Sequence, residues 1–578
     1  MLKRTHRLHE INESLIGQTI IINGWVDRIR NLGGIIFVWV RDRYGMVQVV
    51  FEPDTEPYEV AQTLAGEYVV GIAGLVRERP KDAKNVELVS GNIELLANKI
   101  EILAESKTPP IYTNRDEGNE DARLKYRYLD LRRKSLQSNL IFRHKVTQKT
   151  REYFNSLDFL EIETPYLTKS TPEGAREFLV PSRLKHGAFY TLPQSPQIFK
   201  QLLMIAGFDR YYQIARCFRD EDLRADRQPE FTQIDVEMSF VEQSDVQNAV
   251  SGLIKYLYKA LLNMDIGEIP FMQYRQAIEL YGSDKPDLRF GMEMEDLSNE
   301  EFAAKMDFLA PKNGEAMKSI VIPGNTILSR KDLDGYSETA KSSNLKLGWV
   351  KVHNGEFSGG VSKVLKNSGW SPALKNDEVM LLCTGKRSSV NTFLGRLRNE
   401  IAQKINIIPP NSFKVLWIND FPMFEWNEEK QMYQAQHHPF TMPYLEDLEA
   451  YKDDLGKIRA HSYDLVINGW EMGSGSVRIH TRALQEKVFK LINLTEEDAK
   501  KRFGFFLEAF EYGAPPHAGF AIGVDRLVSI MLGVSSLREV VAFPKTASGT
   551  DLMMEAPSEV SQSQLKELGI KVEVKDDK

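Results

Sequence analysis

Cysteine is nearly absent from this sequence, which has only Cys217 and Cys383 in 578 residues. Two separate thiols build neither a disulfide framework nor a CxxC zinc site, so a reducing compartment is favoured. Runs of eighteen apolar residues are also missing, and the first twenty residues lack the apolar core of a signal peptide. We therefore expect a soluble, cytoplasmic protein that does not bind a membrane.

An excess of positive charge is missing as well, because 74 Lys and Arg stand against 81 Asp and Glu and the formal net charge is −7. A protein that holds nucleic acid only through an overall basic field is therefore not expected, whereas local basic patches remain possible. The composition, with 42% hydrophobic and 27% charged residues, is typical of a folded protein. Since 578 residues exceed what one core organises, we expect several domains.

The segment from Gln213 to Phe240 is the most informative stretch. Two apolar-alternating runs, QIARCF and FTQIDVEM, predict antiparallel strands, and the charged run RDEDLRADRQPE predicts the loop between them. Arginines that hold phosphates and an exposed phenylalanine that stacks on a base suit a nucleotide. Charge alternation alone is typical of a solvated, salt-bridged hairpin. The candidates in this hairpin are Arg219, Asp220, Glu221, Gln228, Phe231 and Asp235.

The first hundred residues predict a small barrel. Three β-rich runs lie between Thr19 and Phe51, and two more cover 67–79 and 92–103. Five strands in this length suit an OB-fold, which binds oligonucleotides on one face. Arg28, Arg30, Phe37, Gln48 and Arg77 are the candidates for that face. The alternative, which periodicity alone favours, is that Phe37 and Trp39 belong to the barrel core.

The next stretch contains a connector and further candidates. Residues 107–118, with a Pro-Pro pair, predict a linker, and RLKYRYLDLRRK (123–134) is either a solvated helix face or a contact to an RNA backbone. A helix is expected over 138–157, followed by a strand that ends at Pro165. Ser195 and Gln197 occupy a turn before a helix that carries Lys200 one turn in.

The last third carries a second group of polar residues. His437 and His438 share a loop without a third ligand at zinc spacing, so a loop that faces a substrate is favoured over a metal site. Asp464 and Glu471 flank a strand and a turn, and paired carboxylates beside a nucleotide suit Mg²⁺. Arg478 follows the run GSGS.

Near the end, the segment GAPPHAGFAIGVDR opens a predicted helix. Gly519 and Gly523 allow close approach of a ligand, and Arg526 lies at a helix N-terminus, where the helix dipole favours phosphate. Val524 and Asp525 complete this candidate group.

Together these stretches resemble the class II aminoacyl-tRNA synthetases. The hairpin resembles motif 2, the strand that ends at Pro165 resembles motif 1, and the segment through Arg526 resembles motif 3. A different texture between about 292 and 410 is similar to the insertion of the bacterial-type aspartyl enzymes. The resemblance implies an α+β multidomain fold with an OB-fold barrel, an antiparallel catalytic sheet flanked by helices, and an inserted α+β domain. The expected divisions are 1–105, 106–135, 136–285, 286–410, 411–557 and 558–578.

The resemblance also implies a reaction. L-aspartate and ATP would give aspartyl-adenylate and pyrophosphate, the aspartate would pass to the 3′-terminal adenosine of tRNA-Asp, and Mg²⁺ would assist. Motif 1 would form a homodimer interface. Arg219 and Arg526 would be catalytic, and Asp464 and Glu471 would hold the metal. The implied aspartate-binding residues are Glu173, Ser195, Gln197, Lys200, Arg219, Asp235, His437 and Arg478. The implied ATP-binding residues are Arg219, Asp220, Glu221, Gln228, Phe231, Glu471, Gly523, Val524, Asp525 and Arg526. Arg30, Phe37 and Gln48 would bind the anticodon.

Three alternatives remain at this point. An asparaginyl or lysyl enzyme fits less well, because Arg478 and Lys200 supply two cations for an acidic side chain. An inactive, RNA-binding paralogue predicts loss of Arg219, Asp464, Glu471 or Arg526, and all four are present. An enzyme that also charges tRNA-Asn often has histidine at the position of Leu32, so leucine resembles the strict type.

Overall fold

The computed structural model describes residues 1–85, 90–171, 175–222, 227–324 and 328–573. It divides into two compact units, one of Met1–Phe142 with Arg538–Ser558 and one of Arg143–Leu537 with Glu559–Lys578. Glu173 lies outside the described residues. No helix in the described ranges is long and apolar enough to cross a membrane.

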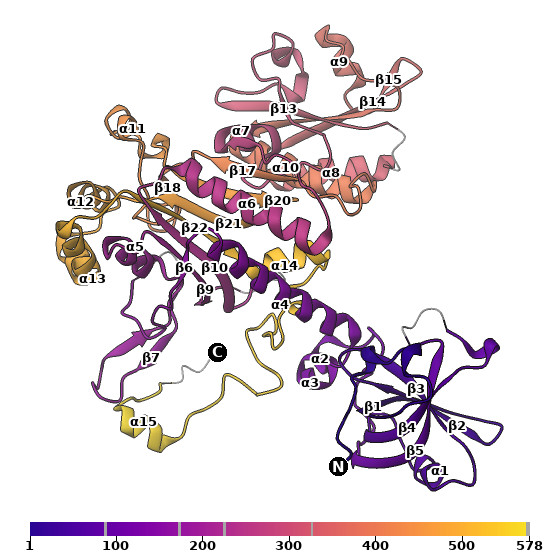
Figure 1. Cartoon of the computed structure of the whole chain (residues 1–578). Helices are drawn as coiled ribbons and strands as arrows, with labels where there is room; N and C mark the ends of the chain where they lie inside the picture. Colours follow the sequence, from indigo (N-terminus) through magenta and orange to yellow (C-terminus); the bar gives the residue numbers. More distant parts are fainter. Residues whose placement is uncertain (86–89, 172–174, 223–226, 325–327, 574–578) are drawn as a thin grey trace. The chain divides into compact units, whose positions relative to one another are not determined.

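The first unit contains the predicted five-stranded barrel (Figure 1). Its strand order is β1-β2-β3-β5-β4 and the barrel is closed, so the sheet has no open edge. Buried and more exposed side chains alternate along most of β1 and along β2, and the inward set of mainly isoleucines and valines forms one core. The strands are β1 (Thr19–Leu32), β2 (Ile35–Arg41), β3 (Met46–Phe51), β4 (Val69–Glu78) and β5 (Ile93–Ala104), with the short helix α1 (Glu56–Ala61) after β3.

The arginine-rich segment 123–134 is only partly exposed, and two of its arginines are buried. It forms α2 (Glu120–Lys125), α3 (Arg127–Asp130) and the start of α4 (Lys134–Asn155). Arg127 and Arg133 are buried and lie 2.7 and 2.8 Å from the buried carboxylate of Asp130. Arg127 also donates to the backbone carbonyls of Arg538, Val541 and Ala542. For Arg127 and Arg133, both sequence interpretations, a solvated helix face and an RNA contact, are wrong.

The second unit is built on an eight-stranded sheet of order β11-β17-β20-β21-β22-β10-β9-β6. The six strands from β17 to β9 are antiparallel, as expected, and each outermost strand pairs in parallel with its neighbour, so the sheet is mixed. The strands are β6 (Leu160–Glu161), β9 (Arg210–Phe218), β10 (Glu230–Ser239), β11 (Phe271–Gln273), β17 (Val415–Asn419), β20 (Ser462–Ile467), β21 (Trp470–Val477) and β22 (His517–Gly523).

Helices cover one face of this sheet, which we call the back face. Trp417 of β17 donates its indole N–H to Ser251 of α6 (Gln243–Leu262) at 2.9 Å, and Figure 1 shows α6 lying across the strands. The ring of Phe154 on α4 stacks on Tyr212 of β9. The backbone N–H of Thr232 on β10 donates to Asp525 of α14 (Val524–Leu532). We call the opposite face of the sheet the front face.

A five-stranded sheet of order β12-β13-β16-β14-β15 forms a separate layer within the second unit. The strands β13 and β16 are buried on both sides, because α8 and α10 share one hydrophobic cluster with the sheet and α9 shares another. The elements are β12 (Glu295–Asp296), β13 (Glu315–Ile322), α8 (Arg330–Ser342), β14 (Lys346–His353), β15 (Glu356–Ser358), α9 (Ser362–Ser368), β16 (Val379–Lys386) and α10 (Arg387–Lys404).

Shorter elements complete the second unit. They are β7 (Leu179–Pro181), β8 (Phe189–Thr191), α5 (Gln197–Ile205), α7 (Tyr274–Tyr281), β18 (Phe424–Asn427), β19 (Met432–Ala435), α11 (Leu445–Ala450), α12 (Arg482–Leu491), α13 (Glu496–Ala509) and α15 (Gln562–Leu568). The helix predicted to carry Lys200 one turn in is α5, as expected.

Candidate functional site

Strand register places the candidate polar residues in rows on the front face. Residues directly opposite each other on neighbouring strands point to the same side of a sheet, and so do residues two apart along a strand. The first row is Asp464, Ser474, Ala521, Asp235 and Gln213, and the second contains Ser462, Ser476, Gly519, Glu237 and Tyr211. Residues separated by more than 200 positions therefore share one surface of about five strands.

Four charged side chains meet on this surface without contact with solvent. Lys200 of α5 reaches down to β10, where its Nζ lies 2.7 Å from Asp235 Oδ1 and 3.3 Å from Glu237 Oε2. Arg478, just after β21, donates Nε and Nη2 to the two oxygens of Glu237 at 2.9 and 3.1 Å. All four residues are buried. Two cations and two carboxylates thus form one charge-balanced cluster, which we call the Lys200–Arg478 cluster.

Glu237 is the member that the sequence-based prediction missed. A signal was available, because Glu237 follows Asp235 by two positions on a predicted strand and so shares its face. Burial would raise the pKa of Glu237, but the charges of Arg478 and Lys200 outweigh it and hold the pKa below its usual value. For Asp235 burial prevails over Lys200, and its pKa is raised. Glu237 is therefore the firmly ionised partner of Arg478.

Gly519 makes room for this cluster. Its position on β22 is directly opposite Glu237, and a Cβ atom added there would lie 1.8 Å from Glu237 Oε2 and 2.4 Å from the Val236 carbonyl oxygen. The second contact is with backbone, which cannot rotate away. Only glycine lets the Glu237 carboxylate lie flat across the strand and face Arg478.

The predicted histidine loop covers the cluster. Burial holds the pKa of His437 at about 4 and that of His438 well below its usual value, so both rings are neutral near pH 7. Arg478 Nη1 donates toward His438 Nε2 at 2.8 Å, and the backbone N–H of Phe440 donates toward His438 Nδ1 at 3.3 Å, so both ring nitrogens face donors. His437 Nδ1 lies 3.1 Å from the Ser474 hydroxyl, while its buried Nε2 has no hydrogen-bond partner among the described residues.

Asp464 and Glu471, the candidate metal ligands, lie on adjacent strands. Burial, together with the charge of Glu471, raises the pKa of Asp464 well above its usual value. Asp464 Oδ1 is buried without a hydrogen-bond partner among the described residues, and Glu471 is about one-third exposed, 3.7 Å from Lys285 Nζ. A cation would relieve this unpartnered Oδ1 oxygen. The described residues contain no group of three or more His, Cys, Asp or Glu side chains arranged to hold a metal by themselves.

The loop of the β9–β10 hairpin begins with Arg219, whose buried Nε makes no hydrogen bond to the described residues. The Arg219 guanidinium lies 5.1 Å from the centre of the Phe231 ring. Arg227 pairs with Glu221 at 2.9 Å, which partly engages that carboxylate. The exposed Asp220 donates its backbone N–H to the Arg176 carbonyl, and Gln228 is buried beside Arg227. Residues 223–226 lie outside the described residues.

The predicted residues of α14 have two different environments. Val524 is buried, and the Asp525 carboxylate is held by Arg143 and by the backbone N–H of Thr232, so its contacts in this structure are structural. A Cβ atom added at Gly523 would meet no clash, since its nearest neighbour, the Met472 carbonyl oxygen, lies 3.8 Å away. Arg526, at the N-terminus of the helix, donates Nη1 to the Glu471 carbonyl at 3.1 Å. Arg526 is thereby tied to the strand that carries a candidate metal ligand.

The turn before α5 contributes the remaining candidates. The Gln197 backbone N–H donates to the Ser195 hydroxyl at 3.3 Å, and the Gln197 side chain is buried with Nε2 unpartnered among the described residues. This turn precedes Lys200 on the same helix, so Gln197 lies close to the cluster along the chain. Glu173 is outside the described residues, and its assignment stays a prediction.

The barrel face in the first unit carries the predicted aromatic. Phe37 and Trp39 are only half-buried, and they alternate with the buried residues Ile36, Val38 and Val40, so the interpretation of Phe37 and Trp39 as barrel core is wrong. Phe37 pairs across the strands with Arg30, and Trp39 with both Arg28 and Gln48. Gln48 and Arg77 both donate to Glu94, at 3.0 and 2.8 Å. Glu94, which the sequence-based prediction missed, therefore orients two predicted residues.

Comparison with known sequences gives matches over nearly the whole chain. The profile of the class II tRNA synthetases (D, K and N) matches residues 119–547, and that of the OB-fold nucleic acid binding domain matches residues 20–103. An aspartate–tRNA ligase of Fervidobacterium nodosum is 51% identical, covering 98% of this chain and 99% of the relative. An aspartate–tRNA(Asp/Asn) ligase of Caldanaerobacter subterraneus is 48% identical, covering 99% of each.

Solved structures show the same fold. The asparaginyl-tRNA synthetase of Pyrococcus horikoshii with asparaginyl-adenylate aligns with a TM-score of 0.61 at 17% identity, covering 94% of this chain and 99% of that one. The aspartyl-tRNA synthetase of Entamoeba histolytica aligns with a TM-score of 0.57 at 17% identity, covering 94% and 91%. Both likenesses concern the fold alone.

Proposed function

This chain belongs to the aspartate–tRNA ligases, a family of class II aminoacyl-tRNA synthetases, and we propose that it is the type that charges tRNA-Asp and not tRNA-Asn. In the proposed reaction it activates L-aspartate with ATP and transfers the product to tRNA-Asp in the cytoplasm. The observation that carries the amino-acid assignment is the buried Lys200–Arg478 cluster on the front face of the sheet.

The cluster supports aspartate as the amino acid. In Arg478, Nε, Nη1 and one N–H of Nη2 already form hydrogen bonds within the protein. The second N–H of Nη2 can donate to the side-chain carboxylate of a substrate. Lys200 supplies a second cation. Asparagine would turn an amide N–H₂ toward these donors, and a buried mismatch of donors costs binding. Gln197 and Asp235 offer acceptors for the α-ammonium group.

The activation step needs positioning and charge neutralisation. The α-carboxylate of aspartate is already a nucleophile, so no protein base is required. It attacks the α-phosphorus of ATP, a new C–O–P bond forms, the bond to the β-phosphate oxygen breaks, and pyrophosphate leaves. Arg219, with an unpartnered Nε, neutralises charge at the α-phosphate, Phe231 stacks on adenine, and Arg526 binds the γ-phosphate.

Asp464 and Glu471 suit Mg²⁺, which takes one or two carboxylates plus phosphate oxygens and waters. The buried, unpartnered Asp464 Oδ1 and the partly exposed Glu471 provide those two carboxylates. When bound, the ion would neutralise phosphate charge. In the protein itself, Asp464 is paired across the strands with Ser474, and Arg526 donates to the Glu471 carbonyl.

Phe37, Arg30 and Gln48 are proposed to bind the anticodon. An exposed aromatic on a sheet stacks with a base, arginine holds phosphate, and an amide reads a base edge. The neighbouring turn carries Leu32, whose side chain is 61% exposed at the end of β1. This turn is where enzymes that also charge tRNA-Asn often have histidine, which supports the strict type.

Aminoacylation of purified tRNA-Asp and tRNA-Asn tests the specificity. We expect kcat/KM for tRNA-Asn to be at least a hundredfold lower, and Leu32→His to reduce this gap while the neighbouring Asn31→His does not. Wild-type protein that charges both tRNAs equally would instead identify the relaxed type, which the name of the Caldanaerobacter relative specifies for that protein.

A homodimer is also proposed, with β6 at the interface. This strand is the edge of the large sheet, and large apolar side chains lie exposed on it and just after it: Leu160, Tyr166 and Leu167. Exposed apolar groups at a sheet edge are a common site of association.

A further inference from the structure

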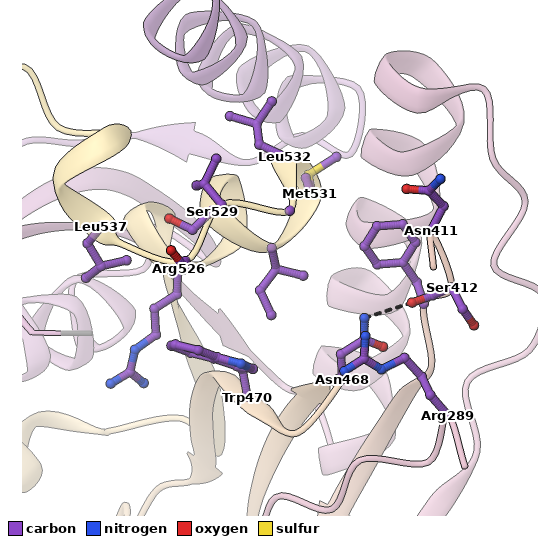
Figure 2. Close-up of a pocket in the computed structure, with 15 residues that line it drawn as sticks. Arg289, Asn411, Ser412, Asn468, Trp470, Arg526, Ser529, Met531, Leu532 and Leu537 are labelled. Carbon is purple, nitrogen blue, oxygen red and sulfur yellow. Dashed lines mark hydrogen bonds between the residues drawn. The ribbon is translucent and has the colours of Figure 1, made fainter. Parts of the chain in front are cut away.

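A cavity of about 320 Å³ opens on the second unit away from the Lys200–Arg478 cluster (Figure 2). Register places it on the back face. Trp470 pairs with Ile467, which lies two positions from Leu465, and Leu465 pairs with Trp417, the residue that contacts α6. Figure 2 shows Trp470 and Arg526 on one wall, and Asn411, Ser412, Asn468 and Arg289 on the other. Residues of α14, among them Ser529, Met531 and Leu532, also line it.

The lining has the composition of a ligand site. Phe413, Trp470, Ile530 and Leu532 provide apolar surface, and the volume falls in the range of small-molecule pockets. The buried Ser529 hydroxyl, part of this lining, has no hydrogen-bond partner among the described residues. Orphaned buried hydroxyl groups are uncommon in folded proteins, so this one is available to a bound molecule.

Arg289, a cation in the cavity lining, has one NH₂ group from which no described residue accepts a hydrogen bond. Arg289 donates Nε and Nη2 to Asp287 at 3.0 and 2.6 Å, while Nη1 makes no hydrogen bond to the described residues. The ion pair fixes the plane of the guanidinium and leaves this edge for a second acceptor. Asn468, by contrast, is satisfied by Ser412 and by the backbone of Lys414.

From these contacts we infer that the cavity binds a small amphipathic anion, with an apolar body against Trp470 and α14 and one carboxylate on Arg289. The cavity shares walls with the catalytic apparatus. Trp470 directly precedes Glu471, and Arg526 contributes to the lining while it hydrogen-bonds the Glu471 carbonyl. If the proposed function of Arg526 holds, occupation of the cavity changes the affinity for ATP, and by thermodynamic reciprocity ATP changes the affinity of the anion by the same factor.

The test uses 4-fluorobenzoate and its neutral analogue 4-fluorobenzamide with the full-length protein, followed by ¹⁹F NMR. We expect benzoate to bind at least tenfold more tightly than benzamide, because charge-assisted hydrogen bonds are about twice as strong as neutral ones. Arg289→Gln should remove this preference. Arg459→Gln is the matched control, because Arg459 makes the same Nε and Nη2 pair with Asp447 but does not line the cavity.

Saturating ATP distinguishes this site from the nucleotide site. We expect ATP to shift the dissociation constant of 4-fluorobenzoate without displacing it. Full displacement by ATP, absence of binding, or equal binding by wild type and Arg289→Gln would each overturn the inference. Failure of the ATP proposal is a separate result, since it would abolish the ATP-dependent shift and leave binding to wild type and its loss in Arg289→Gln intact.

Discussion

Glu237→Gln is the substitution that probes the Lys200–Arg478 cluster most sharply. Glu237 accepts two hydrogen bonds from Arg478 and lies 3.3 Å from Lys200, all without contact with solvent. Glutamine keeps the shape but turns an N–H₂ group toward one of these donors, and it leaves two cations with only Asp235 as counter-charge. Breaking a buried ion pair by removing one partner costs about 3 kcal/mol or more. If that cost falls on the transition state, kcat/KM for aspartate drops about a hundredfold.

The assay is ATP–pyrophosphate exchange at varied aspartate. The loss should appear mainly in KM for aspartate, with KM for ATP changed less than threefold, because Glu237 contacts the amino-acid side of the pocket. Glu449→Gln is the control, since Glu449 makes an exposed ion pair with Lys487, and such pairs contribute about 0–1 kcal/mol. Exchange by Glu237→Gln within threefold of wild type would refute the proposed role of the cluster.

Three further predictions concern other parts of the molecule. Burial and the charge of Glu471 raise the pKa of Asp464, so the ionised carboxylate destabilises the ligand-free protein as pH rises above the pKa of the unfolded state. Asp464→Asn should therefore raise Tm at pH 8 by about 1–3 °C and leave Tm at acid pH unchanged. The same substitution should abolish ATP–pyrophosphate exchange. A lower Tm at pH 8 would contradict this. Burial raises the pKa of the Cys383 thiol to about 12, and Cys217 is also buried, so neither should react with Ellman's reagent until the protein unfolds; rapid labelling in buffer would show the burial to be wrong. Leu160→Asp should convert a dimer to a monomer in light scattering, whereas a wild-type monomer would remove the dimer proposal.

The sequence predicted the elements well because local patterns determine them. The five barrel strands, the β9–β10 hairpin and the helix that begins at Val524 follow from alternation, turn residues and glycine placement. The orientation of Phe37 was harder, because an aromatic on the outer face of a small barrel has the same alternation as one in the core. The burial pattern of β2 shows that Ile36, Val38 and Val40 fill the core and that Phe37 lies on the other face.

Charge was the least predictable feature. The segment 123–134 has the composition of an exposed basic helix, but the burial of its Arg127 depends on Asp130 and on carbonyls about 400 positions away. Similarly, Lys200 and Arg478 were identified as cations, but their pairing with Glu237 required the register of β10, β22 and β21. Long-range partners of buried charges are set by topology, which a single sequence does not display.

We propose that the front-face cluster selects aspartate for activation by ATP. ATP–pyrophosphate exchange without tRNA, with aspartate, asparagine and lysine in turn, measures this directly. We expect exchange with aspartate and at least a thousandfold lower kcat/KM with the other two. Exchange with asparagine or lysine at a comparable rate would contradict the pocket assignment, and no exchange with any of the three would contradict the proposed activation step.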